Sequence, residues 1–137
     1  MAKLIWAVTC SRILLDQPTN LVSYIDLLDG VALLHFPTNA PPTFIGTAWQ
    51  REDEHILEMR VRAYAPDGSH LMDSQAVPLV FEPQHKRGRI HVGFEGFTIP
   101  GPGRYEFGIE IKKDSKWVEV TRIPFDVDAA VAQTFKK

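Results

Sequence analysis

The single cysteine is the first side chain to consider for chemistry. Cys10 ends an apolar run over residues 4–10, and Arg12 follows shortly after it. A reactive thiolate needs a neighbouring cation and access to solvent, whereas a cysteine inside an apolar strand is usually packed and inert. The sequence has no Gly-x-Ser-x-Gly motif, no phosphate-binding glycine loop and no dinucleotide fingerprint. We therefore predict no catalytic residue and a protein that is not an enzyme.

The histidines and carboxylates are spaced too widely to indicate a metal site. No two histidines form a His-x-His or His-x-x-x-His pair, and Asp126 and Asp128 are the closest pair of aspartates. Structural zinc needs about four ligands, and calcium takes about six to eight oxygens. We therefore predict no metal and no cofactor.

Basic residues gather at two places in the sequence. Arg60 and Arg62 share one face of a strand, and residues 85–89 hold a second basic group. The formal net charge is −2, which gives no large basic field to attract nucleic acid. We expect Arg60 and Arg62 to pair with acids of a neighbouring strand, such as Glu106 and Glu110, and residues 85–89 to form a solvated hairpin tip. We predict no binding to nucleic acid.

Aromatic residues suggest a carbohydrate site as an alternative. Trp49, Tyr64 and Trp117 would stack on sugar rings if they stood on a wet sheet face, although large aromatics more often fill sandwich cores. Trp6 is expected in the core. The pattern around Trp49 leaves its face undecided, because small or apolar residues occupy both alternating positions.

The elements that must position these residues are strands. Tyr105, Phe107 and Ile109 alternate with polar residues or glycine, as in a strand with one buried face. The apolar run 4–10 is typical of a strand covered on both faces. Strands are predicted over residues 3–14, 20–28, 31–36, 43–51, 55–65, 69–75, 77–82, 89–99, 104–113 and 117–127, some of them halves of one bent strand.

Turn residues separate these strands. We expect the side chain of Asp16 or Asn20 to accept backbone N–H groups in the turn over residues 16–20. Residues 37–42 contain three prolines and predict a stiff crossing between sheets. Tyr105 follows Gly103 and predicts a tyrosine corner, in which the ring enters the core and the hydroxyl bonds to nearby backbone.

Length and composition fit one globular domain. The chain has 137 residues, of which 45% are hydrophobic and 23% charged. Alternating strands and short turns predict a two-sheet antiparallel β-sandwich, C2-like or immunoglobulin-like, with about eight strands over residues 1–127.

The tail over residues 128–137 breaks the alternation. Asp128 suits the cap of a short helix, in which Val131 and Phe135 would lie one turn apart. We expect this tail either to fray or to dock Val131 and Phe135 on another surface, a second copy of the chain included.

Targeting signals are weak. No stretch approaches the roughly 20 apolar residues that span a bilayer, and the run over residues 4–10 is too short for a secretory signal. We predict no membrane association and a cytoplasmic location.

Three motifs occur along the chain: Asp16-x-x-Thr19-Asn20-Leu21-Val22-Ser23-x-Ile25, Trp49-x-Arg51-Glu52-Asp53 and Pro102-Gly103-x-Tyr105-x-Phe107. Together they resemble a family of small bacterial all-β proteins of unknown function. The resemblance implies a β-sandwich over nearly the whole chain, and it brings no activity, cofactor or catalytic residue.

The sequence thus favours a non-enzymatic module that binds another protein through loops or a sheet edge, since sites for other classes are missing. The alternative is a sandwich that binds a small ligand or carbohydrate through Trp49. A hydrolase would require Asp16 and Asp26 to converge, which nothing in the spacing demands. The candidate binding residues are Trp49, Arg60, Arg62, Val131 and Phe135.

Overall fold

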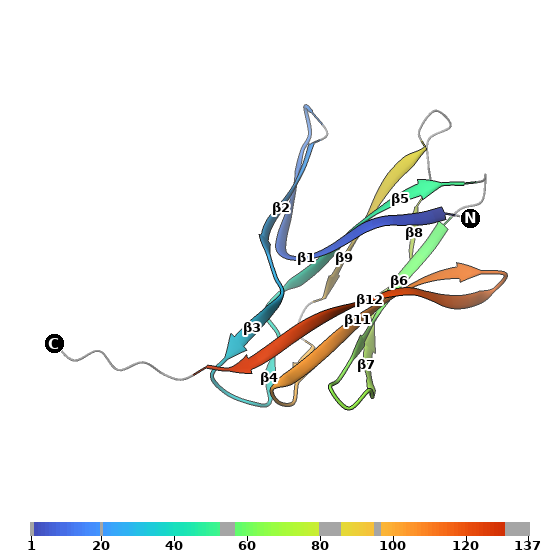
Figure 1. Cartoon of the computed structure of the whole chain (residues 1–137). Helices are drawn as coiled ribbons and strands as arrows, with labels where there is room; N and C mark the ends of the chain where they lie inside the picture. Colours follow the sequence, from blue (N-terminus) through green and yellow to red (C-terminus); the bar gives the residue numbers. More distant parts are fainter. Residues whose placement is uncertain (1, 20, 53–56, 80–85, 95–96, 131–137) are drawn as a thin grey trace.

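The structure is a computed structural model that describes residues 2–19, 21–52, 57–79, 86–94 and 97–130 (Figure 1). These residues contain strands, turns and loops but no helix, so none of them forms a helix that could cross a membrane. The strands are β1 (Ala2–Asp16), β2 (Leu21–Leu27), β3 (Gly30–Leu33), β4 (Thr38–Asn39), β5 (Thr43–Arg51), β6 (Leu57–Tyr64), β7 (His70–Asp73), β8 (Val77–Leu79), β9 (Arg87–Phe94), β10 (Thr98–Ile99), β11 (Gly103–Lys113) and β12 (Lys116–Ala129).

The all-β prediction is confirmed, with more strands than expected. The described residues hold twelve strands rather than about eight. The predicted strand over residues 89–99 is two strands, β9 and β10, and the short strand β4 lies within the proline-rich crossing.

The strands form two larger sheets and one small ribbon. The first sheet has the order β2-β1-β5-β9, and the second has the order β3-β12-β11-β6-β7, with β8 also paired to β6. The ribbon pairs β4 with β10. Only β3 and β12 run parallel among the described pairs; the others are antiparallel, as predicted.

The hydrophobic core lies between the two sheets. Alternate side chains of β5 and β9 meet alternate side chains of β6, β11 and β12, which is the arrangement that the period of two predicts. The rings of Phe94 and Phe107 stack with their centroids 5.4 Å apart. The largest fully buried apolar side chains are Trp49, Phe94, Phe107, Phe125, Ile45, Met59, Ile99, Ile109, Val61 and Val127.

Trp49 belongs to this core, so it cannot be the carbohydrate platform of the sequence-based alternative. Its side chain is 0% exposed. Its indole Nε1 donates a hydrogen bond to the Thr47 hydroxyl oxygen at 2.8 Å, and that hydroxyl donates to the Ile90 carbonyl at 2.8 Å. Because the polar atom of the indole already has a partner inside, no part of Trp49 remains for a ligand at the surface.

Tyr105 forms the predicted tyrosine corner. The ring is buried, and the hydroxyl donates to the carbonyl oxygen of Gly101 at 2.7 Å. This hydrogen bond ties the start of β11 to the turn that precedes it.

Replacing Tyr105 with phenylalanine should lower the free energy of unfolding by about 1 kcal/mol, because the hydrogen bond to the Gly101 carbonyl is lost. Urea unfolding of the two proteins, compared at equal slope, measures the difference. An unchanged midpoint would show that this hydrogen bond contributes no stability.

The turn over residues 16–20 differs from the prediction for Asp16, while the same prediction for Asn20 is not tested. Among the described residues, the Asp16 carboxylate accepts the hydroxyl of Thr19 and no backbone N–H. The Thr19 hydroxyl oxygen in turn accepts the N–H of Leu21 at 3.3 Å. Thr19 is therefore the side chain that binds the backbone here, and Asn20 lies outside the described residues.

The final strand continues past the predicted boundary at residue 127. Asp128 pairs with Ala32 in the parallel β3–β12 ladder, and the N–H of Ala130 donates to the Leu33 carbonyl at 2.8 Å. Asp128 is thus a strand residue and does not cap a helix, because β3 supplies it with a partner strand. Val131 and Phe135 lie outside the described residues, and their docking stays a prediction.

Candidate functional site

A β-bulge in β1 places Trp6 on the outer face of the first sheet. Leu4 pairs with Trp49 and Trp6 pairs with Ala48, so Ile5 is an extra residue between them. A bulge of this kind redirects the side chains that follow it. Trp6 consequently lies half-buried beside the outward-facing Ala48, and the expectation of a core position for it is wrong.

Tyr24 packs on Trp6 across this outer face. The two rings are perpendicular with centroids 5.4 Å apart, and Tyr24 meets the His91 ring in the same manner at 5.6 Å. The Tyr24 hydroxyl lies 3.0 Å from His91 Nε2. Gly46 beneath the ring makes the approach possible, since a Cβ there would overlap Tyr24. These contacts fasten β2 to the sheet at the base of the β1–β2 hairpin.

The Tyr24–His91 pair is uncharged at neutral pH. Burial lowers the pKa of His91 below its ordinary value, and the positive charge of Arg89 lowers it further. Burial also raises the pKa of the Tyr24 hydroxyl. The hydrogen bond therefore joins two neutral groups, and the charge of Arg89 acts on the pKa of both.

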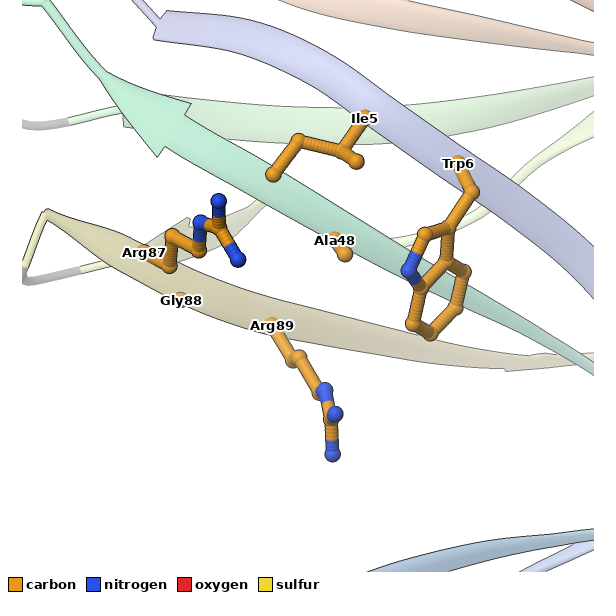
Figure 2. Close-up of a pocket in the computed structure, with 6 residues that line it drawn as sticks. All are labelled: Ile5, Trp6, Ala48, Arg87, Gly88 and Arg89. Atoms are coloured by element: carbon orange, nitrogen blue, oxygen red, sulfur yellow. The ribbon is translucent and has the colours of Figure 1, made fainter.

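A shallow depression lies beside Trp6 (Figure 2). It has a volume of about 250 Å³ and is lined by Ile5, Trp6, Ala48, Arg87, Gly88 and Arg89. We call it the Trp6 depression. Its floor is formed by the small residues Ala48 and Gly88, and the guanidinium carbon of Arg89 lies 5.7 Å from the centroid of the Trp6 ring. The depression thus combines an apolar surface with two cationic side chains.

Arg87 and Arg89 have no acidic partner in the part of the chain that the structure describes. Both side chains are exposed on β9. Their charges are therefore not neutralised by any described carboxylate.

The predicted binding residues Arg60 and Arg62 are in the opposite situation. On the outer face of the second sheet, Arg60 Nε lies 2.6 Å from Glu110 Oε1, which confirms the expected pairing with Glu110. Arg62 pairs with Asp73 of β7 at 2.9 Å instead of with an acid of β11. Both guanidinium groups already have carboxylate partners, so they are poor candidates for binding another molecule.

The aromatic rings near these arginines are also engaged. The Arg60 guanidinium carbon lies 4.4 Å from the centroid of the Trp117 ring, and that of Arg122 lies 4.0 Å from the Tyr64 centroid. The Trp117 and Tyr64 rings thus each lie against an arginine side chain, whereas Trp49 lies in the core.

The β1–β2 hairpin extends beyond the body of the fold (Figure 1). β1 pairs with β5 only as far as Cys10, and from there to Asp16 it pairs with β2. Leu14, Leu15 and Leu21 are 48%, 56% and 66% exposed. Because Leu14 and Leu15 are adjacent in a strand, they face opposite sides. The hairpin therefore exposes leucine side chains on both faces.

Cys10 is a packed thiol, as the sequence predicted. Its side chain is fully buried, and burial raises its pKa. Within the described residues, no group of three or more His, Cys, Asp or Glu side chains is arranged to hold a metal ion.

The chain belongs to a family of unknown function (DUF6941), whose model matches residues 5–128. The match confirms that the resemblance seen in the sequence is to a family of unknown function. It spans the hairpin and every residue that lines the Trp6 depression. No curated protein matches the chain.

Proposed function

We propose that the protein is a non-enzymatic interaction module that binds another protein through the β1–β2 hairpin and the adjoining outer face of the first sheet. The observation that carries this proposal is the exposure of Leu14, Leu15 and Leu21 on a hairpin outside the sandwich. Apolar edge strands promote aggregation, and natural proteins usually cover them or charge them. Leu14 and Leu21 lie on one face of the hairpin and Leu15 on the other, and exposed apolar side chains gathered on one element support a binding site there.

The residue types on the adjoining face support a protein as the partner. Trp, Tyr and Arg are the side chains that contribute most often to the affinity of protein interfaces, and Trp6, Tyr24 and Arg89 lie together here. The Trp6 depression, at about 250 Å³, is smaller than the roughly 300–1,000 Å³ of most small-molecule sites. It has room for one or two side chains of a partner.

A carbohydrate is the second candidate ligand, with Trp6 in place of Trp49. Trp6 is half-buried and borders an open depression, so part of its ring can meet a sugar. Titration with a panel of monosaccharides and oligosaccharides, followed by the NMR signals of Trp6, tests this alternative. Saturable shifts confined to that face would favour it over a protein partner.

The hairpin itself can be tested by two matched double variants. Leu14→Thr with Leu21→Thr removes apolar surface from the hairpin while keeping residues that favour strands. Val118→Thr with Val120→Thr makes the same kind of change on β12, where these valines are 44% and 40% exposed. Partner recovery by affinity purification from the native cell, identified by mass spectrometry, should fall at least about tenfold for the hairpin variant only, because burying two leucine side chains contributes about 3–6 kcal/mol and about 1.4 kcal/mol is a tenfold change in affinity.

Melting temperature and solution mass are measured on the same samples. The hairpin variant should melt close to the parent protein, because the exposed leucines contribute little to the folded monomer. Equal recovery of the partner by both double variants would reject the hairpin as the binding surface. A loss of dimer mass in the hairpin variant alone would identify the partner as a second copy of the chain.

A further inference from the structure

Arg87 and Arg89 of the first sheet differ from the arginines of the second sheet in their described surroundings. On the second sheet each described arginine lies next to a carboxylate: Arg60–Glu110, Arg62–Asp73, Arg104–Asp126 and Arg122–Glu119. In the first sheet, β5, β9 and the part of β1 before Cys10 contain Lys3, Arg51, Arg87 and Arg89 and no acidic residue. We call these three strand segments the cationic sheet body, because their charged residues are all basic. The chain as a whole has a net charge of −2.

The geometry of the Trp6 depression determines which chemical groups can bind beside Arg87 and Arg89. Arg87 and Arg89 are alternate residues of β9, so both lie on the outer face with their Cα atoms about 7 Å apart. Figure 2 shows the Arg87 side chain extending toward Ile5 and the Arg89 side chain extending to the other side of β9. Ile5 and Trp6 approach from β1, and Ala48 of β5 lies between the two sides (Figure 2). An apolar group on Ala48 would contact Ile5 and Trp6, while anionic groups beside it would reach the two guanidinium groups.

We propose that the Trp6 depression receives an acidic segment of the partner protein. An apolar side chain of that segment rests on Ala48 between Ile5 and Trp6, and its flanking carboxylates form charge-assisted hydrogen bonds with Arg87 and Arg89. The inference rests on the proposed function and names the chemistry of the partner. It follows from charge complementarity, because these arginines meet no described carboxylate of their own chain.

A nucleic acid fits this face less well than an acidic protein segment does. A polyphosphate chain is bound by cations spread along a groove, and single strands need several stacking rings. Here Asp16 and Asp26 lie on the strands of the hairpin, next to the cationic sheet body. Tyr24 already packs its ring edge-to-face against Trp6, so Trp6 is the ring that a base would have to use.

The test uses a short synthetic peptide in which glutamates alternate with leucines around one phenylalanine. Its control is the same peptide with glutamine at each glutamate position. Titrations with the glutamate peptide at low salt, monitored by NMR, should show saturable chemical-shift changes at the residues that line the depression: Ile5, Trp6, Ala48, Gly88 and Arg89. The glutamine peptide should bind at least about tenfold more weakly, and added salt should weaken only the glutamate peptide.

Charge reversal on the protein is the second arm. Arg87→Glu with Arg89→Glu should weaken the glutamate peptide at least about tenfold. Lys113→Glu with Lys116→Glu makes the same change in net charge at the exposed β11–β12 turn and should leave binding unchanged. If the melting temperature of the Arg87→Glu, Arg89→Glu double variant falls, the double variant Arg87→Gln with Arg89→Gln, which removes the charges without reversing them, is used in its place.

Three results would overturn the inference. The first is no shift at the depression with the glutamate peptide at millimolar concentration, and the second is equal binding by both charge-reversed proteins. The third is tighter binding of a single-stranded oligonucleotide to this face. If the hairpin double variant still loses its protein partner while any of these occurs, the interaction module stands and only the acidic chemistry of the partner is rejected.

Discussion

Replacing Trp49 with alanine should lower the free energy of unfolding by about 3–5 kcal/mol, the range for a large aromatic removed from a packed core. The side chain is 0% exposed and lies against the apolar residues of both sheets. Its loss also leaves the Thr47 hydroxyl without the indole donor. A domain of this size is typically stable by only about 5–15 kcal/mol, so the variant should unfold at much lower urea concentration or temperature.

Two further variants separate a core role from a binding role for Trp49. Trp49→Phe keeps most of the volume and should retain the fold at a smaller cost. Trp117→Ala removes a half-buried tryptophan that covers Arg60 and should cost less than Trp49→Ala, because less apolar surface leaves the interior. If Trp49→Ala melts with the parent protein but loses its ligand, Trp49 is a binding residue after all and its place in the core is wrong.

The strands were predictable where one face is buried and the other is wet. Residues 104–113 were predicted to within one residue of β11, where Tyr105, Phe107 and Ile109 alternate with polar residues or glycine. Residues 43–51 match β5 as well, although both alternating positions of that strand are mostly buried. The tyrosine corner was predictable for a related reason: Tyr105 and Gly101 are four residues apart, so local sequence specifies the contact.

The outward position of Trp6 in β1 could not be predicted from the sequence. Nearly every residue over 4–10 is apolar, so no alternation marks which side chains face outward. The extra residue Ile5 depends on the register between β1 and β5, which is a long-range property. Without that register, Trp6 looked like a core residue, and the depression beside it could not be foreseen.

The pairing of Arg87 and Arg89 on one face could be predicted only in part from the sequence. Arg87 and Arg89 alternate within a strand pattern, and this was the signal that could have placed them on one face. Their isolation from carboxylates depends on which strands surround β9. Arg62 shows the same limit, since its partner Asp73 is set by the pairing of β6 with β7. Sequence spacing alone cannot distinguish a paired arginine from one that lacks an acid.

Gly46 offers the second large effect, because it controls how the hairpin is held. A Cβ at this position would overlap the Tyr24 ring, which also contacts Trp6 and His91. Gly46→Val should therefore displace Tyr24 and lower the free energy of unfolding by about 1–3 kcal/mol, the usual cost of overpacking. Gly101→Ala is the matched control, since a Cβ there meets no atom within 4 Å.

Amide hydrogen exchange resolves where the effect of Gly46→Val lies. The amides of residues 11–16 and 21–25 depend on β1–β2 pairing alone, and a two-stranded hairpin is only marginally stable without support from the body of the fold. Once Tyr24 no longer fastens β2 to the sheet, these amides should exchange faster while those of β11 and β12 change little. Partner binding should weaken in parallel, because a loosened hairpin must be ordered again on binding. Unchanged hairpin protection in Gly46→Val would show that Tyr24 does not hold the hairpin, and binding would then have to be assigned to the hairpin and the Trp6 depression separately.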